Sequence, residues 1–218
     1  MLGPYIITDL YYKYIKGGFP LGRYPFYKKI GDKEVIFVHI PKTAGSSISR
    51  ALKMNPPNPD FDIEKHLSSD EIYSICGDEV WERAFKFTCV RNPWARLYSH
   101  YHYRRTTGIL GKKGRNWDFI TWGKWILQKS KLRNFRPQVE WIDPGFGQAP
   151  LDLILRFEEL QSGISLLERN FGLSLELPHL LKNDYKTKYE DVYDEELRAL
   201  VADIYKEDIE RFNYRFAD

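Results

Sequence analysis

The chain has 218 residues and a mass of 25.9 kDa, with a formal net charge of +3 at pH 7. Hydrophobic residues make up 43% and charged residues 29% of it, which is ordinary for a soluble globular protein, and the length fits one α/β domain with a sizeable core. The two cysteines, Cys76 and Cys89, are too few for a disulfide framework and lack metal-ligand spacing. Composition therefore excludes a disulfide scaffold and a cysteine-based metal site.

No leader and no membrane segment are visible in the sequence. The N-terminal residues lack a basic-then-apolar signal pattern, and about eighteen consecutive apolar residues, the length needed to span a bilayer, occur nowhere. We therefore expect a cytoplasmic protein without a membrane anchor.

Residues 1–32 show no clear hydrophobic period. They are rich in Tyr, Gly and Lys and contain the pair Gly17-Gly18. We expect an irregular N-terminal arm that packs through its tyrosines onto a single domain of residues 33–218.

A buried strand is predicted at Val35–Ile40, where a short run of mostly apolar and β-branched residues does not alternate with polar ones. Pro41 ends this strand. Gly45 permits a backbone conformation or a close approach that a Cβ would block, and Ser46 and Ser47 are natural caps for the helix that follows.

This strand, loop and helix predict an anion site. Unpaired amides at the start of a helix favour negative charge, and Lys42 adds a cation, so phosphate or sulfate is the expected ligand. The loop is not a Walker A motif, because Lys42 precedes Gly45 rather than following a second glycine, and no Gly-Lys-hydroxyl sequence is present to hold magnesium.

A breaker of asparagines and prolines at 55–60 leads to Lys65 and His66. Ser68 and Glu71 then occupy the positions of a capping box, which predicts a helix from this point. His66 consequently lies just ahead of a capped helix.

A second strand-to-helix junction follows Val90. Asn92 is placed as the helix N-cap and Pro93 as the first helical residue, where its missing N–H costs nothing. Arg91 thus lies at the end of a strand, and Ser99 lies about two turns into the helix. Both side chains are suited to a second phosphate.

Strands near residues 35–40, 86–90 and 152–157 alternate with helices, which predicts an α/β fold: one P-loop-like domain with a central parallel sheet flanked by helices. Ligands of such sheets bind at the carboxyl edge. We therefore expect Lys42 and Arg91 to flank one crevice.

Ten Lys and Arg residues and a single acid, Asp118, lie between Arg104 and Arg136. Aromatic residues are interleaved with them, which favours a binding surface for an anionic partner over a solvated helix. Nucleic acid is one candidate and an acidic sugar chain is the other.

The later chain continues the pattern. A helix opens at Glu158-Glu159 and closes at Gly172, and a further amphipathic helix starts after Asp194. Between them, Lys182–Lys188 is a polar, basic loop.

The segments HIPKTAGSS (39–47) and VRNPWARLYSHY (90–101) resemble the two phosphosulfate-binding motifs of the sulfotransferase superfamily, in particular the carbohydrate-type branch that includes the heparan sulfate 2-O-sulfotransferases and many bacterial relatives. The segments 155–158, 177–180 and 208–214 resemble later parts of that family. The resemblance covers the chain from Val35 to its end.

The resemblance implies 3′-phosphoadenylyl sulfate as donor, adenosine 3′,5′-bisphosphate as product, and no metal. The 5′-phosphosulfate would be held by Lys42, Thr43, Ala44, Gly45, Ser46 and Ser47. Arg91 and Ser99 would hold the 3′-phosphate. The Lys182–Lys188 loop would close over the nucleotide, with a plain surface loop as the alternative.

Sulfuryl transfer to an alcohol needs a base near the acceptor hydroxyl, and histidine suits this role near neutral pH. The heparan sulfate relatives place a catalytic histidine between the two motifs, and His66 is at the matching position. His100, on the second motif's helix, is the alternative base. Lys42 is the second catalytic candidate, since it would neutralise charge on the departing phosphate.

We therefore expect a sulfotransferase that acts on a hydroxyl of an anionic or neutral carbohydrate. Beside a phosphosulfate site, a sugar partner fits better than nucleic acid. Two alternatives stay open: a P-loop-like nucleotide kinase, and a non-catalytic module that binds anions or nucleic acid. Golgi members of the family carry an N-terminal anchor, so a Golgi location would require that an anchor had been trimmed.

Overall fold

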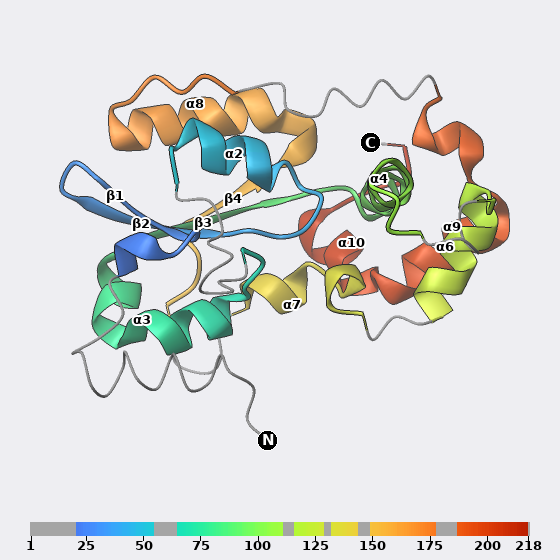
Figure 1. Cartoon of the computed structure of the whole chain (residues 1–218), viewed down its shortest axis with the longest axis horizontal. Coiled ribbons are helices and arrows are strands. Elements are labelled where there is room, and N and C mark those ends of the chain that lie inside the picture. Colours follow the sequence, from blue (N-terminus) through green and yellow to red (C-terminus); the bar gives the residue numbers. More distant parts are fainter. Residues whose placement is uncertain are drawn as a thin grey trace.

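A computed structural model describes residues 21–54, 65–110, 116–128, 132–143, 149–177 and 187–217. Its centre is a four-stranded sheet in the order β1-β2-β3-β4 (Figure 1). The strands are Tyr27–Ile30 (β1), Lys33–Val38 (β2), Phe85–Val90 (β3) and Leu153–Arg156 (β4). β2, β3 and β4 run parallel, as the sequence predicts, and β1 is antiparallel to β2.

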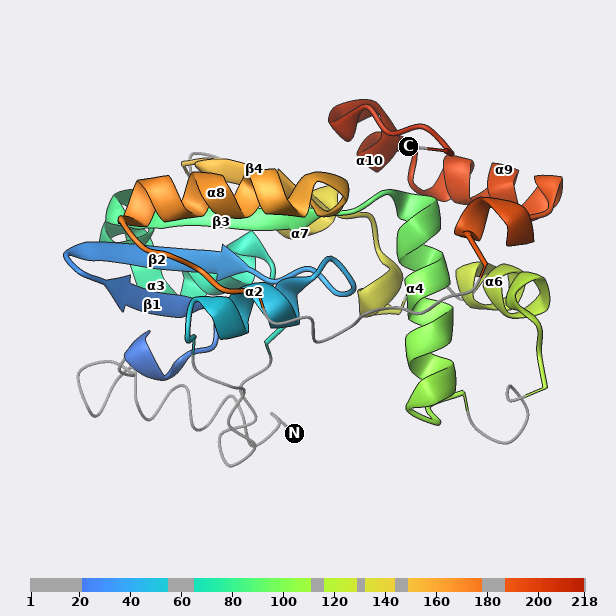
Figure 2. The ribbon, with the colours of Figure 1, turned by 90° about the horizontal axis from the view of Figure 1, so that it is seen from above.

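Helices cover both faces of the sheet. Figure 1 shows α2 and α8 on one face and α3 and α7 on the other, and Figure 2 shows α4, α6, α9 and α10 grouped beyond one end of the sheet. The α-helices are Gly45–Ala51 (α2), Ser69–Arg83 (α3), Pro93–Thr106 (α4), Phe119–Gln128 (α6), Val139–Ile142 (α7), Leu160–Phe171 (α8), Glu195–Ile204 (α9) and Lys206–Phe212 (α10). Short 3₁₀ turns are Leu21–Arg23, Arg133–Phe135, Phe157–Glu159 and Tyr189–Val192. In the described part of the chain, every helix is too short or too polar to cross a membrane.

Strand alternation places the core on both faces of β2. Ile36 and Val38 pack with Trp81 and Trp141 on the α3 side, whereas Phe37 packs with Phe87, Ile48 and Leu155 on the α2 and α8 side. All of these side chains are buried. A separate cluster, centred on Trp122 and Leu197, joins α4, α6 and α9. The expected α/β domain with a sheet between helices is therefore confirmed.

The irregular arm predicted for residues 1–32 is wrong for its last part, because Tyr27–Ile30 forms an edge strand. A turn at Gly31, with φ of 57°, reverses the chain into β2. A search for apolar runs does not detect β1, because two of its four residues are lysines, although lysine is common on edge strands. Residues 1–20 lie outside the described part.

The helices begin and end close to where the sequence places them. The Ser68–Glu71 capping box is present, and α8 closes at Gly172 in the left-handed conformation. The amphipathic segment after Asp194 is divided at Tyr205 into α9 and α10. Of the Lys182–Lys188 loop, residues 182–186 lie outside the described part.

Candidate active site

The loop after β2 and the turn after β3 meet at the carboxyl edge of the sheet, because the two strands are hydrogen-bonded neighbours. The Arg91 guanidinium donates from Nη1 to the Lys42 carbonyl oxygen at 3.3 Å and lies 3.9 Å from the centre of the Phe157 ring. Arg91 is only 9% exposed. The expected convergence of Lys42 and Arg91 is observed.

The backbone of the first loop is held in left-handed conformations at two residues with side chains. The φ angles are 70° at Lys42 and 68° at Ala44, and such conformations are costly for residues other than glycine. Between them the buried Thr43 donates its hydroxyl to the Ile40 carbonyl at 2.9 Å. The Thr43 side chain therefore braces the loop from inside.

The prediction that Ser46 or Ser47 caps helix α2 is wrong. Ala44 holds the N-cap position without a side-chain hydrogen bond, and both serines lie in the first turn of the helix. The amides of Ser47 and Ile48 donate to the Ala44 carbonyl oxygen at 2.9 and 3.1 Å. The amides before them have no partner within the helix, so this uncapped start offers those donors to a ligand.

Gly45 is required by close approach rather than by its own φ. A Cβ built at Gly45 would lie 1.9 Å from the His39 ring, far inside van der Waals contact. The left-handed residues are its neighbours Lys42 and Ala44. The close-approach part of the prediction for Gly45 is confirmed.

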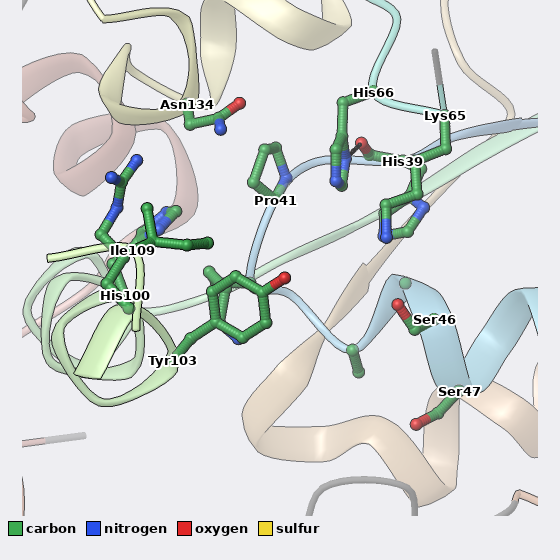
Figure 3. Close-up of a pocket in the computed structure, with 14 residues that line it drawn as sticks. His39, Pro41, Ser46, Ser47, Lys65, His66, His100, Tyr103, Ile109 and Asn134 are labelled. Atoms are coloured by element: carbon green, nitrogen blue, oxygen red, sulfur yellow. Dashed lines mark hydrogen bonds between the residues drawn. The ribbon is translucent and has the colours of Figure 1, made fainter. Parts of the chain in front are cut away.

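A pocket of about 310 Å³ opens where this loop faces α4 (Figure 3). Its walls come from four segments: residues 39–47 of the loop, residues 65–66 before α3, α4 with the chain directly after it, and the 3₁₀ turn Arg133–Phe135. The described lining residues are His39, Pro41, Lys42, Ala44, Gly45, Ser46, Ser47, Lys65, His66, His100, Tyr103, Arg104, Ile109 and Asn134. Lysine, arginine and histidine are thus present in the described lining without any carboxylate, so the pocket favours an anionic ligand.

Lys42 enters this pocket with its Nζ 4.1 Å from the centre of the Tyr103 ring. Burial, together with the positive charges of Arg91 and Lys65, lowers the pKa of Lys42 to about 8. The lysine is therefore protonated in most molecules at neutral pH, and an anion beside it would stabilise its charged form further.

His66 lies in the same pocket and is fixed by two hydrogen bonds. Its Nδ1 is 2.8 Å from the His39 carbonyl oxygen, so Nδ1 carries the proton and Nε2 keeps its lone pair. Its own carbonyl accepts from Arg133 at 2.7 Å, and Arg133 forms an ion pair with Glu71 of the capping box. The start of α3 thus holds the histidine in place.

Burial is also the main reason why His66 is neutral. It lowers the pKa of His66 to about 4, although the bond to the His39 carbonyl acts in the opposite direction, and the nearby cations Lys65 and Arg133 lower the pKa further. At neutral pH the imidazole is therefore in the form that can accept a proton.

His100 is a second histidine in the pocket wall. It is 4% exposed, its ring centre lies 4.5 Å from that of Phe135, and in the described part of the chain its Nε2 has no hydrogen-bond partner. Burial and the neighbouring charges of Arg96, Lys42 and Arg104 hold the pKa of His100 well below its usual value. Both candidate bases therefore face one pocket.

The second motif is built behind this pocket. The side chain of Asn92 accepts hydrogen bonds from the amides of Trp94 and Ala95, and Pro93 starts α4, as predicted. Ser99 is buried on α4, at 2% exposed. Arg91, Ser99 and Thr43 are absent from the described lining of the pocket, which therefore joins the first motif to the histidines but not to the expected 3′-phosphate residues.

Sequence reasoning missed the polar groups that fix these segments. Arg96, buried in α4, donates to the carbonyls of Pro41, Arg136 and Asn134 at 3.2, 3.2 and 3.1 Å. It clamps the first loop to the chain before α7. Only its position inside the second motif could have indicated from the sequence that Arg96 is functionally relevant.

A buried pair, Gln138 and Asp208, fixes the second turn. The Gln138 side chain bonds both the amide and the carbonyl of Arg91 at 2.8 Å, and the Asp208 carboxylate accepts from the amides of Gln138 and Val139 at 2.8 and 2.9 Å. Both residues are fully buried. No local pattern predicts a pair so distant in sequence.

Two of the described basic residues in the stretch from Arg104 to Arg136 form ion pairs within the protein. Lys124 forms ion pairs with Asp194 and Glu196, and Arg133 pairs with Glu71. The described basic residue of this stretch that lines the pocket is Arg104, while Lys112, Lys113 and Arg115 lie outside the described part. Trp122 and Phe135, two of its aromatic residues, belong to the core.

Comparison with known proteins agrees with this geometry. A sequence model of the sulfotransferase family matches residues 28–215, most of the 218-residue chain. Searches of curated proteins and of solved structures found no match. With both motifs at the carboxyl edge of an α/β sheet and a family match of this length, the chain belongs to the sulfotransferase family.

Proposed function

We propose that the protein transfers a sulfuryl group from 3′-phosphoadenylyl sulfate to a hydroxyl of a carbohydrate acceptor. The observation that carries the proposal is one pocket that combines the Lys42 loop with the neutral, fixed His66. Family membership supports sulfuryl transfer in general, and the donor and acceptor are our inference.

The residues at the loop fit an anionic donor. Lys42, the uncapped start of α2 at Gly45, and the hydroxyls of Ser46 and Ser47 would hold the 5′-phosphosulfate, with the backbone of Thr43 and Ala44 shaping the loop. Arg91 and Ser99 would hold the 3′-phosphate. The donor supplies sulfur bound to a good leaving group, the phosphate of adenosine 3′,5′-bisphosphate.

In the transfer, His66 would accept the proton of the acceptor hydroxyl at Nε2 while the oxygen forms its bond to sulfur. The sulfur–oxygen bond to phosphate breaks, and the electron pair stays on the phosphate oxygen. Lys42, in the same pocket, would stabilise the charge that grows there. We assign this charge neutralisation to Lys42 and the amides at the start of α2.

A carbohydrate acceptor is supported by the rim of the pocket. Tyr103 is 42% and Ile109 55% exposed, and both line the pocket beside Arg104. A flat aromatic ring next to a cation suits a sugar ring that carries polar groups.

The cytoplasmic location expected from the sequence belongs to this proposal as well.

Thermal unfolding with a nucleotide panel tests the donor. Adenosine 3′,5′-bisphosphate should raise the Tm, and ATP or AMP should not, because a ligand that binds only the folded state stabilises it. Stabilisation by ATP with magnesium would favour a kinase instead. Salt-dependent oligonucleotide binding that Arg91 substitutions leave unchanged would favour a non-catalytic module.

A further inference from the structure

The His39 ring lies at the junction between the donor loop and His66, a place that the transfer mechanism above leaves without a role. The side chain is 6% exposed, and its ring centre lies 5.4 Å from that of Phe37 and 4.4 Å from that of His66, which it meets edge-on. Burial and the neighbouring charges hold the pKa of His39 well below its usual value. The ring is therefore neutral at neutral pH, and it packs between aromatic neighbours.

The same ring also lies close to Gly45 of the loop. A Cβ on Gly45 would lie 1.9 and 2.0 Å from two atoms of the His39 ring. Such distances cannot be accommodated without movement of the ring or of the loop, since close-packed interiors transmit strain. His39 thus occupies the space that any larger residue at position 45 would need.

The main chain of His39 completes the connection. Its carbonyl oxygen, 2.8 Å from the Nδ1 of His66, sets which nitrogen of the base carries the proton. We propose that His39 is a positioning residue that couples the donor loop to the base: its ring is wedged between Gly45 and His66, and its carbonyl fixes the tautomer of His66.

This inference rests on the proposed role of His66 as base. It explains why a residue without a Cβ stands at position 45 although φ there is not left-handed, and why a buried neutral histidine directly follows β2. Its consequence is that a small displacement of the loop reaches the base directly, and a base misplaced by about 1 Å loses up to about 10²-fold in rate.

A double-mutant cycle between the two positions tests the coupling. Gly45→Ala should lower kcat at least about tenfold, because the new methyl group displaces the His39 ring and with it His66. His39→Ala should also lower kcat, and His39→Phe, which keeps a ring of similar size, should restore most of it. In the His39→Ala background the added Gly45→Ala should cost much less, since the clash is gone. An equal cost in both backgrounds would overturn the proposal.

Two readouts separate this proposal from the proposed function. The tautomer of His66, read by ¹⁵N NMR, should be Nδ1–H in the wild type and become mixed in Gly45→Ala. Gly45→Ala should also lower the Tm in the wild type and much less in His39→Ala, whereas Gly22→Ala, whose Cβ would meet nothing within 4 Å, should change neither property. These measurements need no donor, so they stand even if adenosine 3′,5′-bisphosphate fails to bind.

If Gly45→Ala does not fold, recovery of folded protein in His39→Ala/Gly45→Ala is the expected result. A double variant that also fails to fold, or an unchanged His66 tautomer in folded Gly45→Ala, would remove the coupling.

Discussion

The two strand-to-helix junctions at the carboxyl edge of the sheet look alike in sequence and differ in how their backbones are satisfied. After β2, two non-glycine residues take left-handed conformations and α2 begins without a side-chain cap. After β3, Asn92 caps α4, Gln138 bonds both backbone groups of Arg91, and the Asn92 amide donates to Glu158 at 2.8 Å.

The difference shows what each junction is built for. A loop with left-handed residues and an uncapped helix start at a pocket wall is suited to bind a ligand. A junction whose backbone groups are bonded to side chains of other segments is held in place by them, and it supports the first one through the contact of Arg91 with the Lys42 carbonyl. We infer that the first junction carries the chemistry and the second fixes its geometry.

The largest expected effect is on the base beside the first junction. His66→Ala should lower kcat by about 10²–10⁴-fold with the affinity for adenosine 3′,5′-bisphosphate intact, the range for loss of a general base. His100→Ala is the matched control, since it removes the other histidine of the pocket. A larger loss of kcat in His100→Ala than in His66→Ala would assign the base to α4.

The pH dependence of kcat/KM sharpens the same assignment. A free imidazole titrates near pH 6.5, but the buried His66 has a pKa of about 4 and Lys42 one of about 8. The rate should therefore fall below pH 4, as His66 gains a proton, and above pH 8, as Lys42 loses one. Persistence of the acidic limb in His66→Ala would contradict the role of His66.

Folding stability should fall as the pH is lowered from about 6.5 to about 4. Across this window the unfolded chain binds a proton at His66 while the folded chain does not, because the pKa of the folded form is about 4. One such group changes the folding equilibrium by up to about tenfold per pH unit. His39 and His100, whose pKa values are also depressed, act in the same direction.

Urea unfolding at several pH values measures this effect. His66→Gln should flatten the dependence between pH 6.5 and 4, while the contribution of Glu71, whose pKa is lowered from 4.5 to about 2, should be lost between pH 4.5 and 2. If the free energy of unfolding of His66→Gln depends on pH as steeply as that of the wild type, other groups cause the acid sensitivity.

A smaller effect is expected at the guanidinium of the second junction. Arg91→Ala should lower the affinity for adenosine 3′,5′-bisphosphate by roughly ten- to a hundredfold, because a charge-assisted hydrogen bond is lost. The affinity for a 5′-monophosphate should fall much less. Isothermal titration with both nucleotides measures the ratio. Equal weakening of the two would indicate that Arg91 acts only by bracing the loop through the Lys42 carbonyl.

The parts of this fold that could be predicted from the sequence are those with local signals. Apolar runs predicted β2 and β3. The spacing of Ser68 and Glu71 predicted the start of α3, and Asn92 with Pro93 predicted the start of α4. The position of both motifs after neighbouring strands then gave the contact between the two loops.

What could not be predicted depends on long-range hydrogen bonds and on backbone strain. The cap of α2 falls on Ala44 because the loop geometry, and not a side-chain propensity, sets its conformation. Asp208 and Gln138 become partners only when α10 packs beside the start of α7. The tautomer of His66 likewise depends on a carbonyl that lies in another segment.

The smallest expected effect tests the difference in capping between the junctions. Asn92→Ala removes the oxygen that accepts from the Trp94 and Ala95 amides, and the amide that donates to the Arg215 carbonyl at 2.7 Å. Loss of a helix cap costs about 0.5–2 kcal/mol, and Asn92→Ser, which keeps an oxygen in reach, should recover part of it. Ser46→Ala should change stability by less than about 0.5 kcal/mol, because Ser46 is exposed and does not cap α2. Chemical unfolding of the three variants measures all of these values. A Ser46→Ala cost equal to that of Asn92→Ala would show that the first junction is capped in solution, and its amides would then not be left for a ligand.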